Sequence, residues 1–344
     1  LMDMEMVQFH PTGIVVEGSE LHGAPLEEGL RGAGARLYNA RGERFMERYE
    51  PARLERATRD VVSRACYQEV ADGRGTPSGG VWLDLSHLGA AFVEREFPGM
   101  VERTRAAGSD LARGPVEVSP TAHFLMSGIR IDEHCHTTVE GLYAAGEDAA
   151  GVQGANRLGG NGVAESIVFG ALAGDVMVEE AARRTRPILD EREVDRVVAD
   201  ASAPLRRAEG VDAYALLDRL RAVMWQKVGI IREGQGLQDA IGELTDLASF
   251  ARKVSVGGTP RANPEWQTAL NVKSLVTTSE LIARAALARQ ESRGAHFRKD
   301  FPVENDAAWL KHVVVRKGPD GPLLGTRPIR LRRQRPETVT RAER

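Results

Sequence analysis

Residues 141–178 decide the fold class of this chain. GLYAAGE (141–147) is followed by the loop GANRLGGNG (154–162), and an apolar pattern of helical spacing continues over 163–178. The first segment is a run of small residues that ends in a carboxylate, and it predicts a strand. A strand, a glycine-rich loop and an apolar helix in this order are typical of an α/β nucleotide-binding layer. The sequence therefore predicts an α/β fold with this layer near the middle of the chain.

The segments on either side have a different character. Residues 1–120 mix short strand-like runs with glycine-rich connections; alternation predicts a strand over 81–85, and helical spacing predicts a helix over 54–70. The charged segment 183–198 contains a proline and predicts a domain boundary, and periodicity over 204–290 predicts a helical bundle. We expect the arginine-rich tail after residue 316 to be extended and partly disordered.

Composition restricts the class of protein. At about 150 residues per domain, the 344 residues predict two or three domains, with 42% hydrophobic and 28% charged residues as in soluble globular proteins. A net charge of −3 argues against binding nucleic acid through bulk electrostatics. The two cysteines, Cys66 and Cys135, exclude a disulfide framework and an iron–sulfur cluster ligated by this chain alone. Without an apolar run of membrane-spanning length, a signal peptide or an Asn-x-Ser/Thr sequon, we expect a cytoplasmic protein.

Polar residues beside turn-forming residues are the candidates for chemistry. Arginine pairs with carboxylates through two hydrogen bonds and imidazole is a directional donor, so the set suits a small dicarboxylate. The same residues could instead form surface ion pairs and buried structural histidines, and the residues alone leave both interpretations open. The trio His134-Cys135-His136 is either a weak metal site or a polar surface loop. The dicarboxylate candidates are His10, Glu28, Arg31, Arg59, His123 and Arg157.

Blocks around these residues resemble the flavoprotein subunit of succinate dehydrogenase/fumarate reductase, in the FAD-dependent oxidoreductase 2 family that also includes L-aspartate oxidase. In chain order the blocks are MVQFHPTG (6–13), EGLRG (28–32), GERFMERY (42–49), RDVVSR (59–64), LDLSHLG (83–89), PTAH (120–123), GLYAAGE (141–147), GANRLGGN (154–161) and ESRGAHFRKDFP (291–302). Their common order makes the resemblance specific, and it favours the dicarboxylate interpretation.

The resemblance implies an architecture. It implies a capping domain of α+β type (1–120), the C-terminal piece of the FAD-binding domain (121–182), a helical domain (183–300) and a C-terminal extension (301–344). In the family an FAD-binding Rossmann half precedes the first block. No GxGxxG motif occurs here, and we expect the chain to be a fragment without that half.

The resemblance also implies an activity and residue roles. The family interconverts succinate and fumarate by hydride transfer to or from N5 of FAD. By resemblance, Arg59 is the proton donor or acceptor, and Glu28 and Arg31 relay its proton, because a guanidinium alone is a weak acid. His10, His123 and Arg157 would bind the substrate carboxylates. Glu147 would hold an FAD hydroxyl, and the helix N-terminus at Asn161, Gly162 and Val163 would face the flavin. No metal site is expected.

Departures from the family pattern leave the substrate open. Glu27 stands at a substrate-binding position where the family usually has Thr or Ser, and a carboxylate there would repel a dicarboxylate unless it turns away. Gly162 replaces a serine. The alternatives are an L-aspartate oxidase and, outside enzymes, an inactive structural fragment. Because this chain cannot hold a cluster, the resemblance implies a partner iron–sulfur subunit, together with a membrane-anchor subunit, and a peripheral location on the cytoplasmic face of the membrane.

Overall fold

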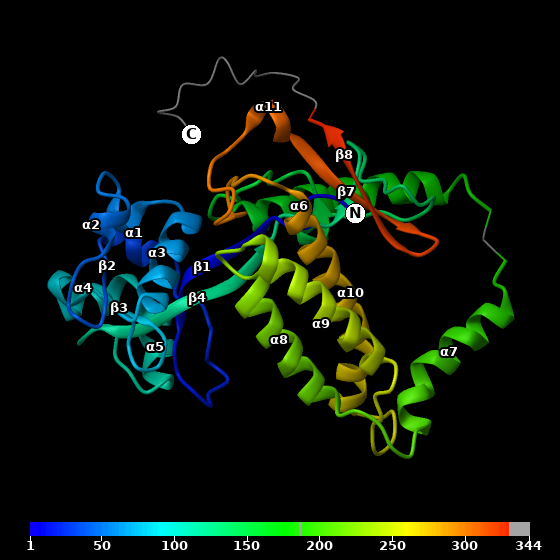
Figure 1. Cartoon of the computed structure of the whole chain (residues 1–344), viewed down its shortest axis with the longest axis horizontal. Coiled ribbons are helices and arrows are strands. Elements are labelled where there is room, and N and C mark those ends of the chain that lie inside the picture. Colours follow the sequence, from blue (N-terminus) through cyan, green and yellow to red (C-terminus); the bar gives the residue numbers. More distant parts are fainter. Residues whose placement is uncertain (186–187, 330–344) are drawn as a thin grey trace.

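The computed structural model describes residues 1–185 and 188–329 and has mixed α and β content (Figure 1). The strands are β1 (Val7–Ile14), β2 (Arg36–Tyr38), β3 (Val81–Asp84), β4 (Val116–Leu125), β5 (Ile129–Arg130), β6 (Ala149–Ala150), β7 (Lys311–Gly318) and β8 (Gly321–Pro328). The α-helices are α1 (Gly29–Ala33), α2 (Met46–Tyr49), α3 (Arg59–Ala71), α4 (Ala90–Glu96), α5 (Pro98–Ala106), α6 (Asn161–Ala181), α7 (Glu191–Arg206), α8 (Ala213–Val228), α9 (Gly234–Ala251), α10 (Pro264–Ala288) and α11 (Asp306–Trp309). Single 3₁₀ turns are η1 (Leu54–Arg56), η2 (Ser86–Leu88) and η3 (Gly146–Asp148).

A four-stranded antiparallel sheet organises the N-terminal part of the chain. Its strand order is β1-β4-β3-β2. Val81 and Leu83 are fully buried while Trp82 and Asp84 are partly exposed, so the predicted strand over 81–85 is confirmed. Helix α3 packs on β1 and β4. Val62 of α3, Ile14 of β1 and Val118 of β4 belong to one core cluster, whose buried members all lie between residues 14 and 118.

The helix predicted over 54–70 is shorter than expected. Residues 54–56 form only the 3₁₀ turn η1, and α3 begins at Arg59. The backbone of Leu54 is left-handed (φ 51°) and that of Ala57 is extended, so the helical path is interrupted there. Nη1 of Arg31 donates hydrogen bonds to the carbonyl oxygens of Glu55 and Ala57, and these bonds stabilise the irregular backbone. The sequence had predicted Arg59 in the interior of a helix. The structure instead places Arg59 at the N-terminus of α3.

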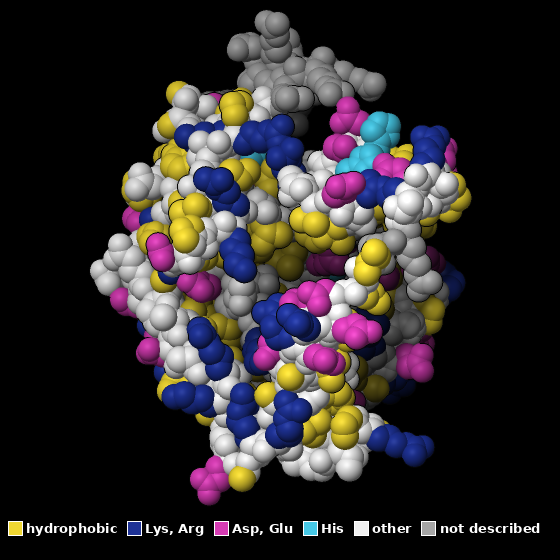
Figure 2. Space-filling model, turned by 90° about the vertical axis from the view of Figure 1, so that its right-hand side faces the viewer, with side chains coloured by type: hydrophobic (Ala, Val, Ile, Leu, Met, Phe, Trp, Pro, Cys, Tyr) yellow, Lys and Arg dark blue, Asp and Glu magenta, His cyan; other side chains and the backbone are white. Residues whose placement is uncertain are grey.

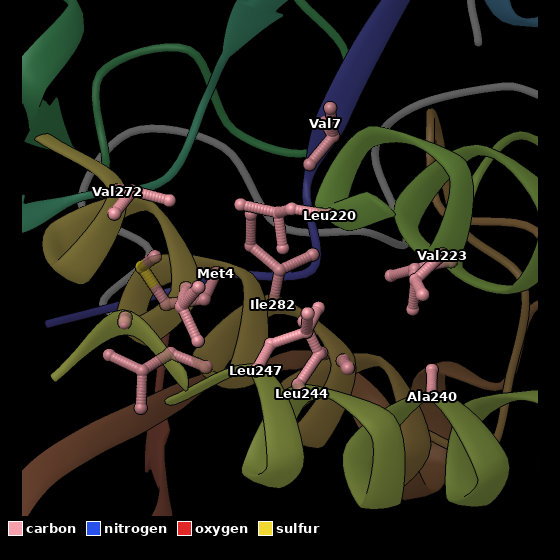
Figure 3. Close-up of a cluster of buried hydrophobic side chains, with 14 of the residues drawn as sticks. Met4, Val7, Leu220, Val223, Ala240, Leu244, Leu247, Val272 and Ile282 are labelled. Atoms are coloured by element: carbon pink, nitrogen blue, oxygen red, sulfur yellow. The ribbon is translucent and has the colours of Figure 1, made fainter. Parts of the chain in front are cut away.

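Helices α8, α9 and α10 pack against one another and confirm the predicted helical bundle. Figure 3 shows Leu220, Leu244 and Ile282 of these helices meeting in the interior. Met4, which precedes β1, and Val7, the first residue of β1, belong to the same apolar cluster. The first strand thus joins the core of the bundle at one end and the antiparallel sheet at the other.

Helix α7 begins inside the segment 183–198 that the sequence predicted as a domain boundary, and it carries exposed apolar side chains. Val194, Val197 and Val198 are exposed by 45–58% among charged neighbours. Figure 2 shows the face of the molecule on this side, where apolar and charged side chains alternate around a hollow.

The strand predicted over 141–147 does not form a ladder. Among the described residues, this segment makes a single bridge between Tyr143 and His136, and Gly146 begins η3. A strand needs a paired neighbour along its length. The parallel pair β5–β6, which includes the residues just after this segment, is only two residues long. The helix predicted over 163–178 is confirmed and longer, as α6.

Helix α6 is the one helix, within 1–185 and 188–329, that is long and apolar enough to cross a membrane by length and composition. Helices of soluble proteins pass the same test. Only 17% of its apolar window is buried.

The sequence predicted an extended tail after residue 316. Up to residue 328, this segment instead forms regular structure. Strands β7 and β8 form an antiparallel hairpin, and Val313 and Val315 of β7 are buried. The N-terminal residues lie along β7, where Asp3 N–H donates to the Val313 carbonyl at 2.8 Å. The hairpin is therefore stabilised by contacts from the other end of the sequence. Arg330, Arg332, Arg333 and Arg335 lie outside the described residues.

Candidate functional site

Strands β1 and β4 bring Gln8, His10 and His123 together. Gln8 pairs with Phe124 and the next residue, Phe9, pairs with Ala122, so His123 is an extra residue in β4. Such a bulge locally redirects a side chain. The rings of His10 and His123 meet edge to face with their centroids 5.1 Å apart. The register shift thus gives two histidines from antiparallel strands a common site.

Glu28 links Arg31 to Arg59. Its Oε1 accepts from Nη2 of Arg31 at 2.9 Å, and its Oε2 accepts from Nη2 of Arg59 at 3.0 Å. Both arginines are buried, with side chains 2% and 9% exposed, whereas the carboxylate is 40% exposed. The three residues that the sequence grouped as a relay therefore form a continuous hydrogen-bonded chain.

Arg157 approaches the same place from the loop before α6. Its Nη1 donates to Oε1 of Gln8 and lies the same distance, 3.4 Å, from Nε2 of His123. The guanidinium lies over the ring of Phe124, with Cζ 4.2 Å from the ring centroid. Nη1 of Arg59 donates to the same Gln8 oxygen at 3.0 Å. We refer to His10, Glu28, Arg31, Arg59, His123 and Arg157 as the cationic cluster.

The cationic cluster carries more positive than negative charge. Burial, followed by the charge of Arg59, lowers the pKa of His10 to about 2 and that of His123 to about 4, so both imidazoles are neutral near pH 7. Because Nη1 of Arg157 is a donor, Nε2 of His123 is the acceptor and the ring proton is assigned to Nδ1. The Nε–H groups of Arg59 and Arg157 are buried and have no acceptor among the described residues. Three guanidinium groups with one carboxylate and spare buried donors are suited to an anionic ligand.

Glu27 is not brought into this cluster. The residue is exposed, its N–H approaches the sulfur of Met100 at 3.4 Å, and its carboxylate lies beside Gly29 and Phe97. No ion pair joins it to an arginine within the described part of the chain.

The residues expected at the flavin lie next to the cluster. Glu147 is exposed, and its Oε1 accepts from the N–H of Leu125 at 2.9 Å. Helix α6 begins at Asn161 after Gly160, whose positive φ of 82° favours glycine. Asn161 and Val163 are exposed, and Gly162 is buried under Arg157. The N–H of Asn161 donates to the Leu158 carbonyl at 3.3 Å and that of Val163 to the Gly160 carbonyl at 3.2 Å, whereas no backbone acceptor for the N–H of Gly162 is found among the described residues. The first N–H groups of a helix carry a partial positive charge, so the arrangement fits the pyrimidine edge of a flavin.

His134, Cys135 and His136 form no metal site. Within the described residues no group of three His, Cys, Asp or Glu side chains could hold a metal ion. His136 instead lies between two carboxylates, with Nδ1 3.1 Å from Asp132 and Nε2 2.5 Å from Glu180. Cys135 is buried, and its thiol approaches the Phe169 carbonyl.

Sequence reasoning missed two residues that organise the site. Gln8 accepts from Arg59 and Arg157, and its Nε2 donates to the Arg157 carbonyl at 2.7 Å. Asn156 donates to Asp60 at 2.9 Å. The sequence could have indicated Gln8, because residues two apart on a strand share a face and Gln8 precedes the candidate His10 by two residues. No comparable sequence pattern indicates the role of Asn156.

Comparison with known proteins shows the family of the chain. A family profile described as "FAD binding domain" matches residues 1–163, and one described as "Fumarate reductase flavoprotein C-term" matches residues 217–342. One subunit of the fumarate reductase (CoM/CoB) of Methanothermobacter marburgensis is 41% identical over 94% of this chain and 58% of that protein. L-aspartate oxidase 2 of Ralstonia nicotianae is 39% identical over 89% of this chain and 52% of that protein.

The solved structures show the same fold. A quinol fumarate reductase chain from E. coli superposes with a TM-score of 0.87 at 32% identity, covering 97% of this chain and 60% of that chain. The chain thus spans between half and two thirds of the length of these relatives. It belongs to the family of FAD-binding oxidoreductase flavoproteins that comprises fumarate reductase, succinate dehydrogenase and L-aspartate oxidase.

Proposed function

We propose that the protein to which this chain belongs is a flavoprotein that interconverts succinate and fumarate. The observation that carries the proposal is the meeting of Arg59 and Arg157 at one oxygen of Gln8. Two like charges held this close, each with a buried donor lacking an acceptor among the described residues, form a site that a doubly charged ligand stabilises.

Substrate binding falls to Arg157, His10 and His123. Arg157 would bind one carboxylate through its guanidinium, which lies over the ring of Phe124. The Nδ1–H of His123 is available as a further donor. Because both imidazoles are neutral, they orient a carboxylate by hydrogen bonds and leave the charge to the arginines.

Proton transfer falls to Arg59. Its Nη2 is bonded to Glu28, which is bonded in turn to Arg31, so a proton lost by Arg59 is replaced through Glu28. The partly exposed Glu28 connects this path to solvent. Arg59 acts as the acid because the carbon that accepts its proton is more basic than the guanidine.

FAD, when bound, supplies the hydride donor or acceptor. In this proposal Glu147 holds an FAD hydroxyl, and the N-terminus of α6 at Asn161, Gly162 and Val163 faces the flavin pyrimidine edge. Donors at that edge stabilise negative charge on the ring.

The wider assembly is part of the same proposal. Residues 1–120 would cap the substrate, which the self-contained core over 14–118 supports. Residues 121–182 would belong to the FAD-binding domain, 183–300 to the helical domain and 301–344 to a C-terminal extension. Electrons would pass to a separate iron–sulfur subunit, with a membrane-anchor subunit holding the complex at the cytoplasmic face.

L-aspartate oxidation is the second candidate, favoured by the 39% identity to L-aspartate oxidase 2. An absorption spectrum of the full-length protein, followed by assays with succinate, fumarate and L-aspartate, separates the candidates. A flavin band with succinate or fumarate turnover is the expected result. Turnover of L-aspartate alone would assign the second activity, and no flavin band would leave only a structural role.

A further inference from the structure

The segment 293–296, from the block that the proposed function does not use, forms a tight turn against the substrate-site loop. Arg293 and His296 exchange backbone hydrogen bonds at 2.8 and 3.0 Å, with Gly294 and Ala295 at the tip. The N–H of Ala295 donates to the carbonyl of Ala155 at 2.9 Å. Ala155 is two residues before Arg157, so the turn contacts the loop that carries that guanidinium.

Gly294 is required for this approach. Its φ of +54° is left-handed, and a Cβ there would lie 2.2 Å from the oxygen and 2.6 Å from the carbon of the Ala155 carbonyl. These are backbone atoms, so no side-chain rotation relieves the overlap. A larger residue would have to displace the 154–157 loop or the turn itself.

A closed ring of contacts connects the turn with α3. Nη1 of Arg64 approaches the Gly294 carbonyl at 3.4 Å, and Nη2 of Arg64 pairs with Asp60 at 2.9 Å. The other oxygen of Asp60 accepts from Asn156 at 2.9 Å, and Asn156 follows Ala155. The ring therefore links the helix that begins with Arg59 to the loop that ends with Arg157.

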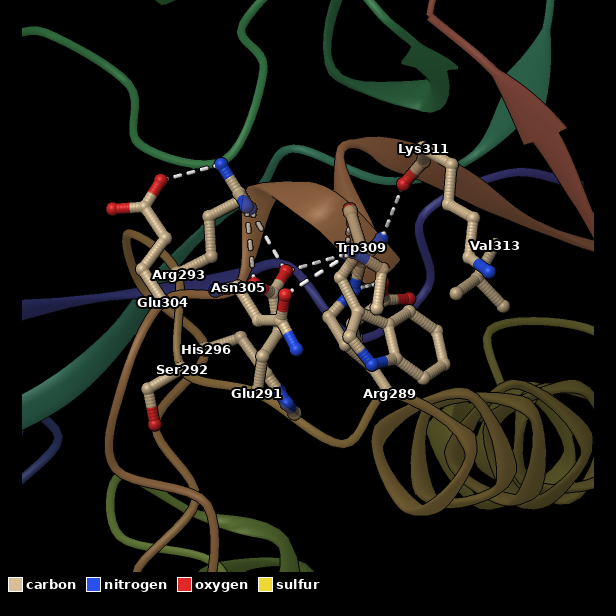
Figure 4. Close-up of polar contacts among 12 residues, drawn as sticks. Arg289, Glu291, Ser292, Arg293, His296, Glu304, Asn305, Trp309, Lys311 and Val313 are labelled. Carbon is tan, nitrogen blue, oxygen red and sulfur yellow. Dashed lines mark hydrogen bonds and ion pairs between the residues drawn. The ribbon is translucent and has the colours of Figure 1, made fainter.

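The base of the turn is anchored in the protein interior. Fully buried His296 is hydrogen bonded through Nδ1 to Nη1 of Arg232, which also donates to the Glu5 carbonyl. Arg293 pairs with Glu291 and Glu304, as Figure 4 shows. The turn is thus a fixed support and the loop is the part that would yield.

We infer that Gly294 is a positioning residue that sets the separation of Arg59 and Arg157. The inference rests on the proposed function for its catalytic consequence. Fixing the 154–157 loop against α3 sets the distance between the carboxylate-binding guanidinium of Arg157 and the proton-donating guanidinium of Arg59, so that both meet a four-carbon dicarboxylate at a defined spacing.

The test is Gly294→Ala in the full-length flavin-loaded enzyme. We expect KM for succinate or fumarate to rise about tenfold or more, because a misplaced binding group costs one to two orders of magnitude. The pH profile of kcat should stay unchanged, since Glu28 and Arg31 do not contact the turn. The matched control is Gly42→Ala, which has φ +76° and no heavy atom within 4 Å of an added Cβ. It carries the same backbone strain without the collision.

Hydrogen exchange gives a readout that does not depend on activity. In Gly294→Ala, amides of residues 154–164 should exchange faster than in wild type, and in Gly42→Ala they should not. Unchanged exchange and unchanged KM would overturn the inference. If wild type turns over no dicarboxylate, the proposed function fails, while the exchange data still decide whether the turn positions the loop.

Asp60→Asn provides a second test should Gly294→Ala not fold. It removes the ion pair with Arg64 while keeping an acceptor for Asn156. We expect KM to rise and the amides of residues 154–164 to exchange faster, as in Gly294→Ala, but both effects should be smaller than in that variant. Where both variants fold, their effects on KM should combine non-additively, because both act on one ring; strict additivity would contradict the shared ring.

Discussion

Arg59 and Arg157 donate hydrogen bonds to the same oxygen, Oε1 of Gln8, at 3.0 and 3.4 Å. Arg59 comes from the first turn of α3 and Arg157 from the loop before α6, so the contact joins the helix that packs on the antiparallel sheet to the loop that precedes α6. Two guanidinium groups repel each other, and a shared acceptor only partly compensates for this. A bound dicarboxylate would supply the missing negative charge.

Replacing Arg59 by lysine should lower kcat by about 10³-fold, within the range for loss of a positioned acid. The three N–H donors of a lysine ammonium sit on one nitrogen, whereas the planar guanidinium of Arg59 reaches Gln8 through Nη1 and Glu28 through Nη2, so lysine does not reproduce this spacing. Flavin content, measured by absorbance, should be unchanged. The control Arg95→Lys alters an arginine that is 67% exposed, and its kcat should match wild type. Retained turnover in Arg59→Lys would remove the acid role.

Replacing Glu28 by glutamine should reduce kcat about 10²-fold with little change in KM. The neutral amide offers one acceptor in place of two and cannot carry a proton from Arg31 to Arg59. Steady-state kinetics over a range of pH measures this. Glu102→Gln, at an exposed position, is the control. An equal loss of kcat in Glu102→Gln would show that the loss follows from removing a negative charge and not from removing the proton path through Glu28.

Glu27→Thr should change KM for a dicarboxylate by less than about fivefold, the effect of a solvent-screened charge of up to ~1 kcal/mol. A carboxylate pointing at the substrate would predict clearly tighter binding on its removal. Glu27 instead lies beside Gly29 and Phe97, outside the cationic cluster. A much larger fall in KM would mean that Glu27 turns inward when substrate binds.

Gly162→Ser should raise KM for a dicarboxylate by about 2- to 30-fold. An added Cβ would lie 2.7 Å from Nη2 of Arg157 and 2.8 Å from Phe124, which forces the guanidinium off the ring. The range corresponds to losing a cation–π contact of about 0.5–2 kcal/mol. Gly170→Ser is on the same helix with no heavy atom within 4 Å of an added Cβ, and should leave KM unchanged. Equal effects of the two would point to a general loss of helix α6.

Stability should fall as the pH is lowered from about 7 to about 5. Unfolded His10 binds a proton below its ordinary pKa of 6.5, but folded His10 resists protonation down to about 2 because of burial and the charges of Arg59, His123, Arg31 and Arg157. Protons thus favour the unfolded state in this window. Urea unfolding at several pH values should give a flatter profile for His10→Gln than for wild type. Parallel profiles would show that His10 is not the group responsible.

His136 should have the opposite effect. Hydrogen bonds to Glu180 and Asp132 raise its pKa, so its contribution is complete below the ordinary value of 6.5 and is lost as the pH rises through the higher folded value. The difference in unfolding free energy between wild type and His136→Gln should therefore shrink as the pH rises above 6.5. A difference that does not vary with pH would exclude a charged His136.

The sequence by itself determined the family, the helical bundle, the strand over 81–85 and all six members of the cationic cluster, because these depend on local periodicity and on residue type at fixed spacing. Tertiary structure decided how they meet. The bulge at His123 arises from the register between β1 and β4, and the break before Arg59 from carbonyls bonded to Arg31. The roles of Gln8 and the outward direction of Glu27 likewise depend on neighbours far away in the chain. Such contacts leave no periodic trace, since their free energy comes from side chains that only the folded chain brings together.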